Sequence, residues 1–212
     1  MLLLNIRLRH ATLGLAATML ASCALLEPQA ERYSPPPVGT TYERDIRQTG
    51  SYGKSFREVS KYLGERSVMG RTLFAHERST GQTSMLDSGG GWVGQFKGES
   101  PIFTFEPSMT VGYPMKVGKT TTKEVRLTMH AQKRVLPFQS TWKVEAYEDV
   151  TVPAGTFKAF RVSYQDSLGA TGMNWINPDT GIFVKWSNRR SEKHPMGAGT
   201  QDAELLSVNT NR

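Results

Sequence analysis

The chain has 212 residues, a net charge of +7 and a single cysteine, Cys23. One thiol excludes an intrachain disulfide, and it also excludes a metal site built from several thiolates. The length suits one domain that is large enough to bury a sizeable core.

Residues 1–22 are predicted to be a signal peptide. Arg7 and Arg9 form a short basic region, and the apolar run over 11–21 is shorter than the roughly 20 residues that a membrane-spanning helix needs. The run ends in Leu20-Ala21-Ser22-Cys23, which resembles the lipobox of bacterial lipoproteins. The resemblance implies that Cys23 is acylated and becomes the first residue of the mature chain. The alternative is an ordinary signal peptide with a chance cysteine.

Acylation of Cys23 would attach the protein to a membrane, since several acyl chains give stable anchoring. By the sorting preference of lipoproteins, Ala24 instead of Asp favours the outer membrane, so we expect a cell-envelope protein that faces the periplasm. Removal of residues 1–22 lowers the net charge to +5. A basic patch for anionic lipid or glycan and a scatter of Lys and Arg over solvated strands both explain this charge. No nucleic-acid partner is expected in this compartment.

Residues 23–40 are predicted to be the acylated cysteine followed by a tether. The segment after Cys23 has no apolar periodicity and contains Pro35-Pro36-Pro37, which favours a stiff polyproline conformation. Such a tether would hold the domain off the bilayer. Residues 41–212 are then expected to form a single β-rich domain.

Within that domain, apolar residues recur mostly at strand spacing. Glycine-rich breaks separate the expected strands, two of them at Gly64-Glu-Arg66 and Asp87–Gly91, and residues 107–118 are expected to be a less regular loop. The expected strands are 40–49, 56–63, 68–78, 82–86, 92–96, 102–105, 120–131, 173–176, 182–186 and 203–208, together with the two arms of a hairpin centred on 150–162.

The central hairpin is predicted from its turn. Pro153 suits the second position of a type I turn, and Gly155 can take the positive φ that closes a three-residue connection with a bulge. The apolar faces of the two arms are expected to carry Trp142, Val144, Ala146, Phe160, Val162 and Tyr164. A second hairpin is predicted at Asn177-Pro-Asp-Thr-Gly181, a sequence typical of a tight turn.

These strands predict a mainly β fold: a single antiparallel curved sheet, barrel-like or a half-barrel, with few or no helices. The apolar concave face of such a sheet is a candidate ligand site, and the alternative is that side chains fill it. The candidate ligand-lining residues are Trp142, Phe160, Trp175 and Trp186, which could equally belong to the core.

No residue pattern supports catalysis or a cofactor. His76, His130 and His194 lack the short spacing of metal ligands, and there is no GxSxG nucleophile motif. We therefore predict no catalytic residue, no metal and no cofactor, and we expect that the protein is not an enzyme. A hydrolase acting on envelope glycans or lipids remains an alternative.

The segments Tyr147–Phe157 and Trp175–Lys185, with Tyr113–Lys119 before them, resemble a group of uncharacterised exported bacterial domains. That group is similar to the lipoprotein-carrier fold of LolA and LolB. The resemblance implies a curved antiparallel sheet with a hydrophobic concavity, and it implies no catalytic residues.

Together these features predict a membrane-anchored, non-enzymatic binding or assembly module. Its expected partner is a lipid or another apolar ligand in the concave sheet. The main alternative is a structural lipoprotein with a filled core that presents its surface to envelope proteins.

Overall fold

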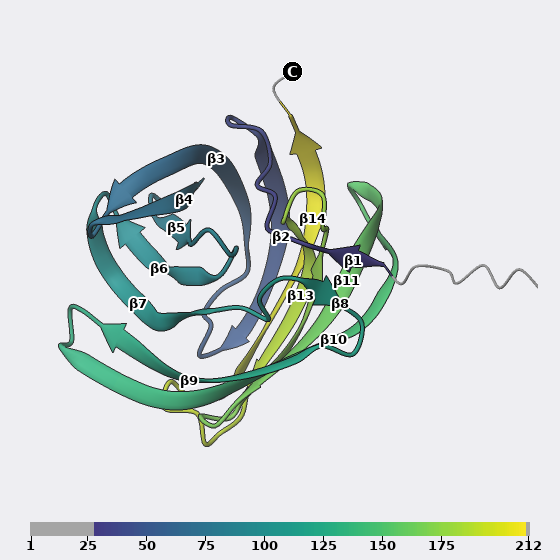
Figure 1. Ribbon diagram of the computed structural model, residues 1–212. Coiled ribbons are helices and arrows are strands. Elements are labelled where there is room, and N and C mark those ends of the chain that lie inside the picture. The colour runs from purple at the N-terminus through teal and green to yellow at the C-terminus, as the bar shows by residue number, and fades with distance from the viewer. Residues whose placement is uncertain (1–27, 211–212) are drawn as a thin grey trace, which may run out of the picture.

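The structure, a computed structural model, describes residues 28–210 (Figure 1). The predicted signal peptide and acylation site Cys23 lie outside the described residues and stay predictions. Residues 28–210 form strands and no helix, which confirms the mainly β fold class. The strands are β1 Gln29–Ala30, β2 Thr41–Gly50, β3 Phe56–Val68, β4 Arg71–Arg78, β5 Thr83–Leu86, β6 Trp92–Lys97, β7 Ser100–Met109, β8 Met115–Lys116, β9 Thr120–Met129, β10 Arg134–Val152, β11 Gly155–Asp166, β12 Ala170–Ile176, β13 Phe183–Arg190 and β14 Gly199–Asn209.

Twelve of these strands close into an antiparallel barrel. Their order around the wall is β10-β11-β12-β13-β14-β2-β3-β4-β5-β6-β7-β9, and β9 returns to β10. The predicted curved sheet is thus a complete barrel. Closure leaves no unpaired edge strand in the wall.

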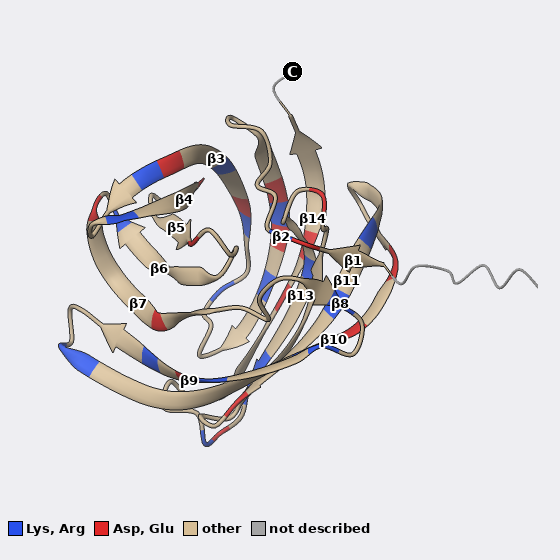
Figure 2. Ribbon diagram, viewed as in Figure 1, with Lys and Arg blue, Asp and Glu red and all other residues tan. Residues whose placement is uncertain are grey.

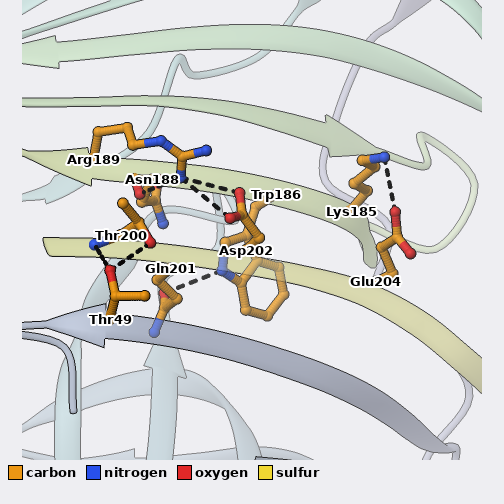
Figure 3. A network of polar contacts seen from close by, with 9 residues as sticks. All are labelled: Thr49, Lys185, Trp186, Asn188, Arg189, Thr200, Gln201, Asp202 and Glu204. Carbon is orange, nitrogen blue, oxygen red and sulfur yellow. Dashed lines mark hydrogen bonds and ion pairs between the residues drawn. The ribbon is translucent and has the colours of Figure 1, made fainter. Parts of the chain in front are cut away.

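Charged residues of both signs are spread along the strands of the wall (Figure 2). On β13 and β14, Lys185 pairs with Glu204 at 2.8 Å and Arg189 with Asp202 at 3.1 Å (Figure 3). Such partly exposed pairs each stabilise the fold by at most about 1 kcal/mol, but they make the outward face of each strand compatible with water.

The central hairpin forms where it was predicted, with two corrections. Val152 pairs directly with Gly155, so the connection is the two residues Pro153 and Ala154 instead of three. A register shift after Val144 then changes the alternation of β10. As a result Tyr147, and not the predicted Ala146, lies on the face of Phe160, because a bulge moves the following side chains to the opposite face.

Two segments that were predicted to be irregular contain strand residues in the structure. The expected break at Gly64-Glu-Arg66 is absent, since β3 continues to Val68 with a register shift between Tyr62 and Gly64. The bulge absorbs the glycine without ending the strand. In the expected loop 107–118, Met115–Lys116 forms β8. Lys119 Nζ fixes this loop by donating hydrogen bonds of 2.9 Å to the carbonyl oxygens of Gly112 and Pro114.

The described part of the predicted tether packs on the barrel. Residues 29–30 pair with 115–116 as β1 and β8 of a small second sheet. Ala30 and Tyr33 are both only 8% exposed, and Pro36 is also buried. This segment packs on the barrel because Ala30 and Met115 join Val144, Phe160 and Val162 in one apolar cluster, which removes their surfaces from water.

Tyr33 closes this end of the barrel by inserting its ring between two turns. The ring lies 5.4 Å from that of Phe74 and 6.4 Å from that of Tyr113. Gly90 and Gly181 face the ring from the β5–β6 and β12–β13 turns, and a Cβ atom at either glycine would collide with it. Both glycines also have positive φ, 68° and 62°. The two turns are therefore shaped to receive this one side chain.

We expect Gly181→Ala to destabilise the protein more than Gly70→Ala. Both positions have positive φ, but a Cβ at Gly70 would meet nothing within 4 Å. Backbone strain should cost about 1 kcal/mol at each site, and the collision with Tyr33 should add about 1–3 kcal/mol at Gly181. Urea unfolding of the purified protein measures both losses. Equal losses, or a larger loss that persists when Tyr33 is also changed to Ala, would contradict the proposed seat for Tyr33.

Candidate functional site

Trp142, the first of the predicted ligand-lining residues, faces the barrel interior. Its ring lies 4.6 Å from that of Tyr164, centroid to centroid, and it lines a cavity together with Tyr33 and Met115. The Nε1 atom of Trp142 is buried and has no hydrogen-bond partner among residues 28–210. The cavity measures about 30 Å³, which is close to the volume of one water molecule. The space beside Trp142 is thus too small for an acyl chain.

Phe160, the second predicted residue, is almost fully enclosed. It is 1% exposed, and its ring lies 4.8 Å from that of Tyr147. Ala30 and Met115 of the small sheet belong to the same apolar cluster. The chain's own N-terminal segment therefore covers the surface on which a ligand was expected.

Trp186 also faces the interior, while Trp175 does not. Trp186 pairs across the strands with Asn174, and its Nε1 donates to Gln201 Oε1 at 3.1 Å (Figure 3). Trp175 pairs with Arg161 and Lys185 on the opposite face, where its Nε1 donates to Glu148 Oε1 at 2.8 Å. The structure therefore places Trp142, Phe160 and Trp186 on one face and separates Trp175 from them, because successive side chains of a strand alternate between faces.

A buried polar cluster on β2, β3 and β4 was not found by the sequence analysis. It consists of the buried residues Tyr42, Arg44, Glu58, Ser60 and His76 and of the partly buried Arg78. Glu58 is 3% exposed and accepts hydrogen bonds from Arg78 Nε at 2.5 Å and from Ser60 Oγ at 3.1 Å. The alternation of side chains along β2 could have revealed this cluster. Arg44 lies two residues from both Tyr42 and Ile46 and therefore shares their inward face.

Arg44 brings a positive charge into this cluster. Its Nε and Nη2 donate to the carbonyl oxygen of Phe183 at 3.4 and 3.1 Å. Its guanidinium carbon lies 4.2 Å from the centroid of the Tyr42 ring and 5.2 Å from that of Trp186. Burial lowers the pKa of Arg44, and the negative face of each aromatic ring favours the charge that remains there.

His76 is held as a neutral base. Its Nδ1 is hydrogen-bonded to Tyr42 Oη, and its Nε2 is buried without a partner among residues 28–210. Burial, and then the positive charge of Arg44, lower the pKa of His76 to about 3. Burial also raises the pKa of the Tyr42 hydroxyl. Both groups are therefore uncharged at neutral pH, and their main effect is to link β2 to β4 inside the barrel.

The described part of the chain, residues 28–210, lacks two kinds of feature. No group of three or more His, Cys, Asp or Glu side chains in this part of the chain is arranged to hold a metal ion. None of these residues forms a helix that is long and apolar enough to cross a membrane.

Comparison with known proteins gives structural neighbours but no family. No family model and no curated protein matches the chain. A chain described as an exported protein with a YmcC-like fold, from Bacteroides fragilis, has 14% identity and a TM-score of 0.48, covering 85% of this chain and 100% of its own. A protein described as a lipoprotein, from Parabacteroides distasonis, has 10% identity and a TM-score of 0.43, covering 85% and 99%.

The hypothetical lipoprotein YmcC from Escherichia coli has 14% identity and a TM-score of 0.43, with coverage of 93% and 99%. These identities and TM-scores are too low to carry a conclusion about what this chain does. The likeness to the LolA and LolB fold stays a prediction.

We expect acid to destabilise the protein through His76. Because the pKa of His76 is depressed in the folded state, the unfolded chain binds a proton more readily once the pH falls below about 6.5. Between that pH and about 3, this residue alone should lower the free energy of unfolding by about 1.4 kcal/mol per pH unit. His76→Gln removes the titrating group, so urea unfolding at pH 7, 5.5 and 4 should show a shallower loss. Parallel profiles of variant and wild type would contradict this assignment.

Proposed function

We propose that this chain is a lipid-anchored, non-enzymatic assembly module of the bacterial cell envelope. In this proposal Cys23 carries the anchor in the outer membrane, and the barrel faces the periplasm and presents its outer surface to other envelope proteins. The lipobox supports the anchor. We choose an assembly module because the chain's own side chains, Ala30, Tyr33 and Met115, pack beside Trp142 and Phe160, where a ligand was expected.

The filled interior favours protein interaction over lipid carriage. Sites for drug-sized ligands enclose about 300–1,000 Å³, whereas the cavity beside Trp142 encloses about 30 Å³. Tyr33, Ala30 and Met115 occupy the face on which an acyl chain would lie. A lipid carrier would first have to withdraw the segment around β1 from the barrel.

The buried polar cluster favours a structural role over hydrolysis. His76 is 8% exposed and Glu58 3%, so a glycan or lipid substrate does not reach them in this conformation. Glu58 is bound by Arg78, and His76 by Tyr42. These partners stabilise strand packing, since an unpaired charge in the same place would be strongly destabilising.

Anchoring is tested by Cys23→Ser. We expect the wild-type protein to sediment with membranes and the variant, exported with a signal peptide that is cleaved without acylation in place of residues 1–22, to appear in the soluble periplasmic fraction, because the variant cannot be acylated. Fractionation followed by immunoblotting measures this. Membrane association that survives the substitution would show that the lipid anchor is not what holds the protein there.

Native mass spectrometry distinguishes an assembly module from a carrier. For the Cys23→Ser protein, purified gently and mixed with a long-chain fatty acid, which supplies an acyl chain without a phospholipid headgroup, we expect only the mass of the polypeptide, because the cavity beside Trp142 has no room for an acyl chain. The same protein with Tyr33→Ala, in which the end of the barrel is opened, is the matched comparison. A fatty-acid adduct on the protein with Tyr33 intact would overturn the filled-barrel proposal in favour of a carrier.

A further inference from the structure

A second, larger cavity lies where the described chain begins. It has a volume of about 390 Å³, within the range of ligand sites. The N-terminal segment 28–34 forms one side of it, the β12–β13 turn forms another with Pro178 and Asp179, and Tyr147 and Phe160 of the barrel wall also line it. It is separate from the small interior cavity beside Trp142.

The wall of this cavity is aromatic as a consequence of the bulge in β10. The register shift after Val144 brings Tyr147 onto the face of Phe160, where the two rings lie 4.8 Å apart at an interplanar angle of 45°. Phe160 is buried, while Tyr147 remains partly exposed. An electron-rich ring at the edge of an open cavity attracts cations.

Three charged side chains line the same cavity: Glu31, Arg32 and Asp179. All three residues are exposed, and none of them forms an ion pair with another residue of the 28–210 range. Gln29 Nε2 donates to Glu31 Oε1 at 2.5 Å, which orients that carboxylate. Two carboxylates beside an aromatic ring suit an ammonium group, and a guanidinium suits a phosphate.

The position of the cavity in the chain points to the source of such a ligand. Pro28 lines the cavity, and Cys23 precedes it by only five residues. A fully extended chain of that length spans at most about 18 Å. If Cys23 is acylated, the cavity is therefore held near the polar surface of the bilayer.

We propose that this cavity binds the headgroup of a zwitterionic phospholipid that carries a primary ammonium. The ammonium lies between Glu31, Asp179 and the ring of Tyr147, and Arg32 binds the phosphate. The inference rests on the proposed anchoring at Cys23, which supplies the membrane. Headgroup binding would fix the barrel's orientation on the bilayer and leave the far side of the wall free for partners.

The test uses the full-length acylated protein in a detergent that contains no phosphate or amine. The probe is glycerophosphoethanolamine, the water-soluble headgroup without acyl chains, and calorimetry measures its binding. Glycerophosphoglycerol, which keeps the phosphate but lacks the ammonium, is the matched probe. We expect the first to bind about tenfold more tightly than the second, because only it engages the carboxylates.

Variants assign the binding to this cavity. Asp179→Asn and Arg32→Gln should each weaken glycerophosphoethanolamine binding about tenfold, while Glu192→Gln, at an exposed carboxylate that is not among the cavity-lining residues, should leave it unchanged. Asp179→Asn should preserve the turn, since the turn is held by Asn177 Oδ1, which accepts hydrogen bonds from the backbone N and the Oγ1 of Thr180.

Absence of binding, equal binding of the two probes, or equal effects of all three variants would overturn the proposal. The soluble probe does not require the membrane. Failure of this titration is therefore distinct from failure of the Cys23→Ser fractionation, which tests anchoring alone.

Discussion

The insertion of Tyr33 between two turns is the contact on which the rest of this structure depends. It brings the N-terminal segment across the open end of the barrel, where Gly90 and Gly181 leave space for one aromatic ring and no Cβ atom. Once Tyr33 is in place, β1 can pair with β8, and Ala30 and Met115 can cover Phe160. A segment that was predicted to be a spacer thereby becomes part of the core.

The polar cluster around Arg44 also occupies the interior of the barrel. A barrel of twelve strands has a wide lumen, and small apolar residues alone would leave voids in it. Long polar side chains fill that space provided that their charges are compensated. Glu58 and Arg78 compensate one another, and the Tyr42 and Trp186 rings surround Arg44. The cost of burying these groups is offset by pairing, and the cluster links three neighbouring strands.

A single register shift connects the fold to the proposed headgroup site. Without the bulge after Val144, strict alternation would place Ala146 beside Phe160 and turn Tyr147 outward. With the bulge, the strand presents an aromatic pair at the mouth of the larger cavity. The same hairpin thus closes the core on one side and shapes a surface that could meet a membrane.

The sequence by itself determined the elements of this protein, because turns are local. Pro153, Gly155 and the Asn177–Gly181 run specify their hairpins through their own backbone preferences, and alternation identified most strands and the mainly β class. The sequence could not place Trp175 and Trp186 on opposite faces of the sheet, since a bulge of one residue switches the faces to which the following side chains point. Only the tertiary structure decided that Ala30, Tyr33 and Pro36 are buried against the barrel, and that Arg44 and His76 are buried together. Each depends on contacts between segments far apart in the chain, which no local pattern encodes.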